Sequence, residues 1–373
     1  MKKKVQLDFD IFDYDLPTPE EAMGEVFQFW QDMFVGEENA PEGGKKIGSA
    51  SSKDRRISMS FMSSPISPVW NWSDLDYTNS NDEPNLNLTI MALILATNIE
   101  CKIGDYSWSL IESSLSKLGF INIVHYYFDF NEDVSSAAMV FARSKKPVNG
   151  KYVVAAVFRG TSSLADVVSD VKSTVDGFYE AGMESVSMLS AYIDSQNLTR
   201  KNTTLFITGH SYGAANASLV GVLSTGLAER NSIFCYPFAT PNYDSDGRTG
   251  KGMKMFSFDS IEDIVTQIPV GPHLDKTGVQ IVFDRLAIQQ DHPEEYKRFQ
   301  RIYKYFRHRY YEEDFDFLSE DYTLNSYDEK IRNDSEIFQN HMTYTYMALI
   351  LCELPDDVID SYIGKAADPG KEK

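Results

Sequence analysis

The chain of 373 residues contains 42% hydrophobic and 24% charged residues, which is the balance of an ordinary globular protein rather than a disordered one. It has 35 Lys and Arg and 55 Asp and Glu, so the net charge is −20. That field would repel nucleic acid and anionic lipid surfaces, which excludes both as general partners. The longest apolar run, residues 90–96, is too short to cross a bilayer, so we expect no transmembrane segment.

The N-terminal sequence MKKKVQLDFDIFDYD begins with basic residues but lacks the apolar segment of a secretory signal. The three cysteines, Cys101, Cys235 and Cys352, are widely spaced and form no metal-binding pattern. Each has apolar neighbours, among which a free cysteine behaves as a small hydrophobic residue. We therefore expect a cytoplasmic protein without a bound metal, while export by another route stays open.

An N-terminal extension is expected over residues 1–85. Thr18 and Pro19 have the pattern of an N-cap followed by the first helical residue, and they predict a helix that ends near Phe34. Residues 36–55 are rich in Gly, Ser and charged side chains, and they predict a flexible loop.

One domain is expected over residues 86–355, followed by a tail over 356–373. Helical patterns occur at 85–98, 107–118, 163–172, 177–195 and 212–228, and strand-like runs at 120–128, 136–143, 151–158, 203–208, 232–238 and 253–258. Strands separated by helix-length segments predict the α/β class, with a mostly parallel central sheet and helices on both faces. A charged helical insertion is expected at about 286–335. Its segment 286–312 indicates a solvated helix, and the flanking acidic runs disfavour a basic RNA-binding stripe.

The segment LFITGHSYGAANA, residues 205–217, combines a strand-like run, a turn centred on Ser211 and a helical continuation. A G-x-S-x-G sequence in this context predicts a nucleophile elbow, a sharp turn that presents its serine at the end of a strand. Gly209 and Gly213 are expected because a Cβ at either position would strike the neighbouring strand or helix. Ser211 is therefore the candidate nucleophile.

A serine nucleophile needs a base to accept its proton and an acid to orient that base. After a nucleophile elbow, the acid and then the histidine base follow the serine in chain order. His341 lies where a polar stretch gives way to an apolar helix, and it is the candidate base; a partly exposed helix-cap histidine is the alternative. The remaining histidines are set aside for their order, their charged surroundings or their closeness to the acid: His125, His210, His273, His292 and His308.

The acid is expected within MKMFSFDSIEDIVTQIP, residues 253–269, which offers Asp259, Glu262 and Asp263. Asp259 is so close to the strand that its side chain can be held locally. Asp263 comes a short loop later, beside apolar residues that could bury it against an imidazole. The residues alone favour Asp263 over Asp259 and leave the choice open.

The oxyanion of an acyl-transfer reaction needs two donors. The backbone N–H of Tyr212, directly after the nucleophile, is one candidate. The second is Thr161, in the loop after the strand-like run 152–158, through its N–H and its hydroxyl.

Five motifs resemble the class 3, or fungal-type, lipases of the α/β-hydrolase superfamily. They are, in order, VFRGTSSLADVVSDV, TGHSYGA, FATPN, EDIVTQIP and HMTYTY, and the resemblance covers roughly 86–352. It implies Ser211 as nucleophile, Asp263 as acid, His341 as base and Thr161 as oxyanion donor. Thr266 departs from the family pattern, which usually has Pro after D-x-V. Ala214 replaces a common Gly after the elbow, and Val175 stands where the family often has His. Together these departures bear on substrate preference more than on activity.

The segment 163–172 has apolar residues at helical spacing, among them Leu164 and Val168. In the lipases that it resembles, such a segment covers the active site and opens at a lipid interface. A crossover helix packed permanently on the sheet is equally consistent with the pattern.

The sequence therefore predicts a serine carboxylic ester hydrolase, a lipase or esterase acting on lipid esters, with no cofactor and no metal. The expected partners are the ester substrate and, transiently, a lipid interface. Phospholipase or other acyl hydrolase activity on the same triad is one alternative. A catalytically silent hydrolase fold used for binding is another, and the intact candidate triad argues against it.

Overall fold

The structure is a computed structural model that describes residues 83–100, 109–126, 138–160, 175–243, 249–268, 276–315 and 336–363. The predicted N-terminal helix and loop, Thr161 and the segment 163–172 lie outside these residues. Within the described ranges, no helix is both long enough and apolar enough to span a membrane.

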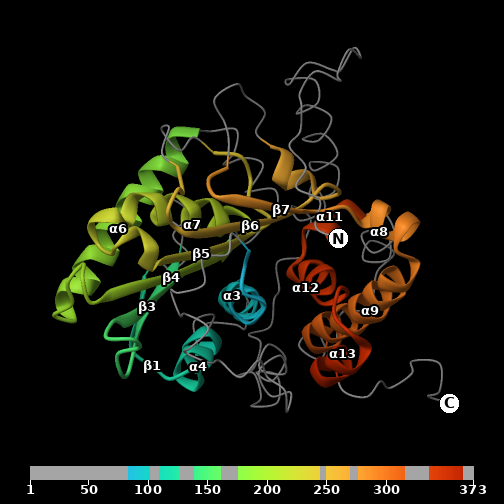
Figure 1. The fold of residues 1–373 in the computed structure, drawn as a ribbon, viewed down its shortest axis with the longest axis horizontal. Helices are drawn as coiled ribbons and strands as arrows, with labels where there is room; N and C mark the ends of the chain where they lie inside the picture. The colour runs from blue at the N-terminus through green and yellow to red at the C-terminus, as the bar shows by residue number, and fades with distance from the viewer. Residues whose placement is uncertain are drawn as a thin grey trace, which may run out of the picture.

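A seven-stranded sheet forms the centre of the molecule, with its strands in chain order from one edge to the other (Figure 1). The strands are β1 (Phe120–Tyr126), β2 (Met139–Ser144), β3 (Tyr152–Phe158), β4 (Thr203–His210), β5 (Ile233–Phe238), β6 (Lys254–Ser260) and β7 (Val279–Phe283). The first three strands pair antiparallel, and β3 to β7 pair parallel. The predicted mostly parallel sheet is confirmed, and the carboxyl ends of β3 to β7 meet at one edge.

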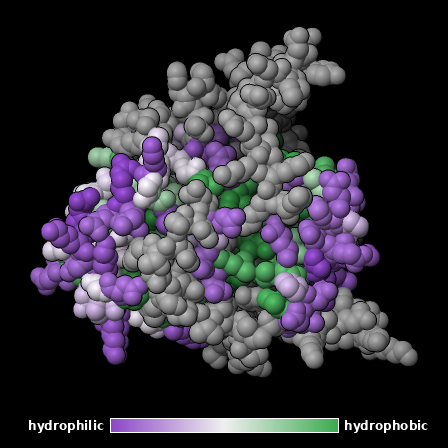
Figure 2. All heavy atoms as spheres, in the orientation of Figure 1, coloured by the Kyte–Doolittle hydropathy of each residue, from purple (hydrophilic) through white to green (hydrophobic). Residues whose placement is uncertain are grey.

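Helices cover both faces of this sheet, as predicted (Figure 1). The described helices are α3 (Leu86–Glu100), α4 (Ser109–Lys117), α6 (Val175–Ser195), α7 (Tyr212–Leu223), α8 (Arg285–Asp291), α9 (Pro293–Phe315), α11 (Glu336–His341), α12 (Thr343–Leu351) and α13 (Asp356–Ile363). Side chains of α6 and α7 share one apolar cluster with the strands, and those of α3, α4, α9 and α12 share the other. Figure 2 shows hydrophilic residues over the outer helices on the left and right of the molecule.

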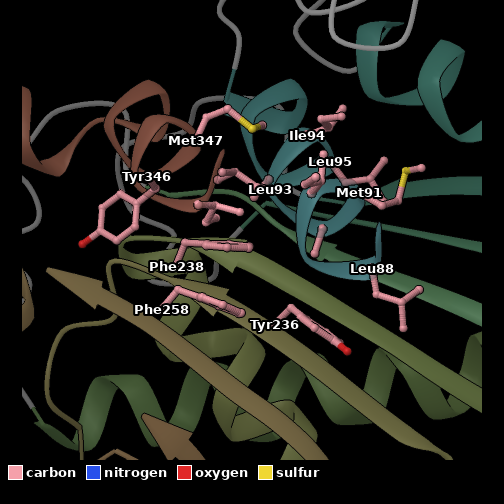
Figure 3. Packing of buried hydrophobic residues seen from close by; sticks show 14 of the residues in the cluster. Leu88, Met91, Leu93, Ile94, Leu95, Tyr236, Phe238, Phe258, Tyr346 and Met347 are labelled. Carbon is pink, nitrogen blue, oxygen red and sulfur yellow. The ribbon is translucent and has the colours of Figure 1, made fainter. Parts of the chain in front are cut away.

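The two clusters form because successive strand residues point to opposite faces of a sheet. Along β4, Phe206 belongs to the cluster under α3, whereas Leu205 and Ile207 belong to the cluster under α7. Figure 3 shows the first cluster, in which the rings of Phe238 and Phe258 lie side by side below α3 and α12. Their centroids are 5.0 Å apart in a stacked arrangement. Large aromatic side chains thus fill the space between the parallel strands and α12, a helix near the C-terminus.

One strand was not predicted, and two predicted helices differ in the structure. β7 was not predicted, because its five residues are too short to give a clear alternating pattern. The helix predicted over 212–228 ends at Leu223 and continues as a 3₁₀ turn, Ser224–Gly226. The single helix predicted over 286–312 is two helices, because Pro293 cannot continue the hydrogen bonding of α8 and instead begins α9.

The surroundings of His341 also differ from the prediction. It was expected at the transition from a polar loop to an apolar helix, but it is the last residue of the short helix α11. Met342 has extended backbone angles, φ −73° and ψ 146°, and separates α11 from α12. The polar composition of this stretch concealed the helix, since α11 is too short to show helical periodicity.

The edge strand β1 contains an irregularity at Asn122, whose φ of 54° lies in the left-handed region. The pairing of β1 with β2 shifts register between Ile121 and Val124 as a result. The Tyr192 hydroxyl on α6 donates to the Asn122 carbonyl over 2.8 Å, which fixes the irregular residue to the helix above it.

Candidate active site

Ser211 stands between the end of β4 and the start of α7, in the geometry of a sharp elbow. Its backbone angles are φ 57° and ψ −127°, a region that non-glycine residues rarely adopt. Its N–H donates to the Phe238 carbonyl over 3.0 Å, which anchors the turn to the neighbouring strand β5. The strain is held by the packing of the sheet around it, as a nucleophile elbow requires.

The two glycines of this turn lie against backbone rather than side chains. A Cβ placed on Gly209 would lie 2.3 Å from the Gly213 carbonyl oxygen, and one on Gly213 would lie 2.4 Å from the Phe158 carbonyl oxygen. Backbone atoms cannot rotate out of the way as a flexible side chain could. Both positions of the elbow therefore require glycine, and the end of β3 lies directly beside Gly213.

Tyr212 is the first residue of α7. The first N–H groups of an α-helix have no partner inside the helix, and they lie at its positive end. The Tyr212 ring packs on Phe178 of α6, with centroids 5.2 Å apart. Tyr212 follows Ser211 directly, so its backbone N–H is at the position from which an oxyanion donor is expected. The other predicted donor, Thr161, lies outside the described residues.

His341 and Asp263 form a buried pair. The imidazole Nδ1 is 2.9 Å from Asp263 Oδ2 and 3.0 Å from Oδ1, and the exposed fractions of the two side chains are 4% and 0%. A carboxylate only accepts hydrogen bonds, so Nδ1 carries the proton. In the neutral imidazole Nε2 then has a free lone pair, which is the state of a general base.

The loop of Asp263 is held by several further hydrogen bonds. Asp263 caps the 3₁₀ turn η8 (Ile264–Gln267), accepting from the Val265 N–H at Oδ1 over 3.0 Å. Thr266, which stands where the class 3 lipases usually have Pro, donates its hydroxyl to the carbonyl of Asp263 over 2.8 Å and that of Ser260 over 3.0 Å. A threonine hydroxyl thus stabilises the turn at this position.

Tyr346 on α12 is a third donor to the same carboxylate. Its hydroxyl donates to Asp263 Oδ2 over 2.7 Å and accepts from the Ser260 N–H over 3.2 Å. Burial and the neighbouring negative charge of Asp263 raise the pKa of Tyr346 well above its ordinary value. The hydroxyl therefore keeps its proton and remains a donor to Asp263.

Asp259, the other candidate acid, is engaged elsewhere. It forms a buried ion pair with Lys276, with Oδ2 3.1 Å from Nζ. Its Oδ1 accepts from the Thr240 N–H over 3.0 Å, and its Oδ2 accepts from the Ser257 hydroxyl over 3.1 Å. Burial raises the pKa of Asp259, and the Lys276 ammonium opposes that rise. The geometry thus brings Asp263, not Asp259, to His341.

The segments that carry His341 and Ser211 are linked through His210, the residue before Ser211. The imidazole Nε2 of His210 lies 2.7 Å from the carbonyl oxygen of His341, and the two rings are 4.7 Å apart. Within the described part of the chain, Ser211 Oγ and His341 Nε2 are both buried and have no hydrogen-bond partner. The two atoms are therefore not hydrogen-bonded to each other in this structure, and proton transfer between them requires that they come within hydrogen-bond reach.

Sequence reasoning missed two contributors to this site. His210 was set aside because its place in the chain precluded the role of base, and its link to His341 depends on tertiary structure. Tyr346 lies within the quoted HMTYTY motif, but periodicity cannot show which of its side chains reaches the acid. Among the described residues, no group of His, Cys, Asp and Glu could hold a metal ion.

The family model described as lipase (class 3) matches residues 153–272. This span contains the elbow and Asp263 and ends before His341. The match confirms the resemblance predicted from the sequence motifs and supports lipase or esterase activity. None of the curated proteins compared with the chain matches it significantly.

Several solved lipase structures are similar to the chain. One is described as a triacylglycerol lipase whose catalytic centre is formed by a serine protease triad, with 17% identity and a TM-score of 0.39, covering 53% of this chain and 79% of that one. The Rhizomucor miehei triacylglyceride lipase has 18% identity, a TM-score of 0.41 and the same coverage, 53% and 79%. The Lip2 lipase of Yarrowia lipolytica has 16% identity and a TM-score of 0.34, covering 52% and 77%. At identities and TM-scores this low, the likeness does not establish a shared substrate.

Proposed function

From the class 3 lipase match over residues 153–272, we propose that the chain is a serine carboxylic ester hydrolase with Ser211 as nucleophile, His341 as base and Asp263 as orienting acid. The observation that carries these roles is the placement of His341. Its Nδ1 faces the Asp263 carboxylate, and its backbone carbonyl is bound to the residue before Ser211. A histidine fixed at both points and with Nε2 unpaired among the described residues has the form of a general base.

In the proposed reaction, Ser211 Oγ attacks the ester carbonyl carbon while His341 Nε2 accepts its proton. The imidazolium that forms is stabilised by Asp263. The tetrahedral intermediate then breaks down, and His341 gives the proton to the departing alcohol. Water, deprotonated by His341, attacks the acyl-enzyme and releases the acid and free Ser211.

The developing oxyanion would be stabilised by the Tyr212 N–H at the start of α7 and by Thr161. Support for the second assignment comes from the position of the preceding strand, because the end of β3 lies against Gly213 of the elbow. Thr161 follows that strand end by a few residues. Each such donor contributes on the order of 10²–10³-fold to kcat in serine hydrolases.

We propose lipid esters as the substrate class, with transient contact to a lipid interface. The match to the class 3 lipase model supports this choice, since lipases act on esters of fatty acids. The net charge of −20 suggests an uncharged ester surface rather than an anionic one.

A fluorophosphonate probe tests the proposal directly, because it phosphonylates only a serine that has been activated. Wild-type protein should be labelled, and Ser211→Ala should not. Hydrolysis of p-nitrophenyl esters, triglycerides and phospholipids by the same preparations would rank the substrates. A wild-type protein that is folded yet neither labelled nor active on any ester would mean that the hydrolase fold serves binding instead.

A further inference from the structure

The last carbonyl groups of an α-helix have no partner within the helix. α11 ends at His341, and the extended Met342 prevents the helix from continuing, so the His341 carbonyl is one of these groups. It is bound from another element, by the imidazole of His210 at 2.7 Å. Because a carbonyl can only accept, His210 Nε2 must carry a proton and donate it.

His210 belongs to the turn that carries the nucleophile. It is the last residue of β4, its exposed fraction is 4%, and it precedes Ser211 directly. Its ring lies 4.7 Å from the ring of His341 and edge-on to Tyr346, at 6.3 Å between centroids. The His210 imidazole thus binds the backbone carbonyl of His341 and packs on the His341 ring. It also packs on Tyr346, the tyrosine that donates to Asp263.

We propose that His210 is a positioning residue, which fixes the base His341 relative to Ser211 through the His341 carbonyl. This inference rests on the proposed function, since it assigns His341 the role of base. Two other contacts of α11 lead toward the acid: Asn340 Nδ2 donates to the Glu262 carbonyl over 3.1 Å, and His341 itself binds Asp263. A further contact leads to α9, where the Tyr303 hydroxyl donates to Gln339 over 2.6 Å. Among these contacts, the bond from His210 joins the base to the nucleophile's own strand.

The geometry explains why a histidine suits this position. The donor must reach past the turn to a backbone oxygen on another segment, and it must belong to a ring that packs on the imidazole of His341, to which the His210 ring is tilted by 38°. Phe in place of His210 would keep the flat ring and lose the donor. Gln would place an amide N–H at about the reach of Nε2 and lose the ring, whereas the amide of Asn is one bond shorter.

We would compare wild type with His210→Phe, His210→Gln and His210→Asn. For each, kcat and KM on a soluble p-nitrophenyl ester, the rate of fluorophosphonate labelling, and Tm would be measured. Thr97→Val is the matched control, because it removes a buried hydroxyl donor to a helix carbonyl, that of Leu93 at 2.8 Å, on a helix that holds no proposed site residue. It reports what the loss of such a bond does to Tm alone.

We expect His210→Phe to lower kcat and the labelling rate together by about 10- to 100-fold, with KM changed by less than about twofold, because a displaced base impairs the chemical step and not substrate binding. His210→Gln should recover most of this loss, and Thr97→Val should keep wild-type kcat. If His210→Phe does not fold, the comparison of Gln with Asn serves instead, and Gln should be the faster. The proposal is overturned if His210→Phe keeps wild-type kcat and labelling, or if Gln is no faster than Phe or Asn. Wild-type protein that is neither labelled nor active would overturn the proposed function itself, which is a distinct result.

Discussion

Asp263 and His341 are 78 residues apart in the chain and meet as a buried pair, with Nδ1 2.9 Å from Oδ2. The pair joins the loop after β6 to the end of α11. Tyr346 adds a further contact between the same loop and the C-terminal helices, through its hydrogen bond to Asp263. The candidate acid and base are thus held where two distant parts of the chain pack together.

The two aspartates of this region should behave differently when each is replaced by Asn. Asp263→Asn should lower kcat by about 10⁴, the effect of losing the acid in serine proteases, because an amide can favour the wrong tautomer of His341. Asp259→Asn should reduce kcat much less. It should instead lower the free energy of unfolding by about 3–5 kcal/mol, since the buried Lys276 ammonium would lose the opposite charge of Asp259 and keep its hydrogen bond to the Thr266 carbonyl. Steady-state kinetics and urea denaturation of both variants separate the two effects, and a reversal of their kinetics would make Asp259 the acid.

Tyr346→Phe should lower kcat roughly tenfold with little change in KM, because the carboxylate would lose one of the groups that fix it toward His341. Loss of the hydroxyl also leaves the Ser260 N–H without its acceptor, which should destabilise the fold by about 1–3 kcal/mol. Tyr192→Phe is the control, since it removes another tyrosine hydroxyl that bonds to backbone, far from the site. An equal effect of both variants on kcat would assign Tyr346 a structural role only.

The elbow glycines give a stability prediction. Gly213→Ala places a methyl group 2.4 Å from the Phe158 carbonyl oxygen, and the backbone of β3 must move to admit it. We expect a loss of more than about 3 kcal/mol of stability, in the range of overpacking with backbone strain, together with loss of probe labelling. Gly226→Ala should be neutral within about 1 kcal/mol, since its Cβ would meet no atom within 4 Å. Thermal denaturation of the two variants side by side tests this contrast.

The segment 163–172 stays a prediction from the sequence, with two alternatives. If it is a mobile cover, replacing Leu164 and Val168 with Ser should weaken activity on aggregated substrate and largely preserve hydrolysis of a short soluble ester. If it is a fixed crossover helix, the same double variant should lose several kcal/mol of stability by burying two hydroxyl groups, with both activities reduced alike. Tm and both activities measured on one preparation decide between them.

The elbow was predictable because its determinants are local. A strand, two glycines at fixed spacing and a helix all lie within thirteen residues, and each follows from short-range sterics. The parallel strands β3 to β6 were likewise visible as apolar runs, whereas β7 was not. The choice of Asp263 over Asp259 needed the family resemblance, because residues alone could not show that Lys276 would occupy Asp259.

The remaining features depend on tertiary contacts. His210 looked irrelevant to catalysis because chain order precludes it as the base, and only the fold brings its Nε2 to the His341 carbonyl. α11 could not be recognised, since a helix of six residues with a mixed polar and apolar sequence carries no periodic signal. What the sequence concealed was therefore mainly the set of groups that orient the base and the acid.

The irregularity in β1 has a consequence for how copies of this protein meet one another. A regular outer strand offers an unbroken row of N–H and C=O groups to which a strand from another molecule can add. The left-handed Asn122 and the shift of register between Ile121 and Val124 interrupt that row. Since the Tyr192 hydroxyl fixes the Asn122 carbonyl to α6, the interruption is part of the folded state. β1 is thus a poor template for intermolecular strand addition, so the edge of the sheet that it forms is protected from this route to aggregation.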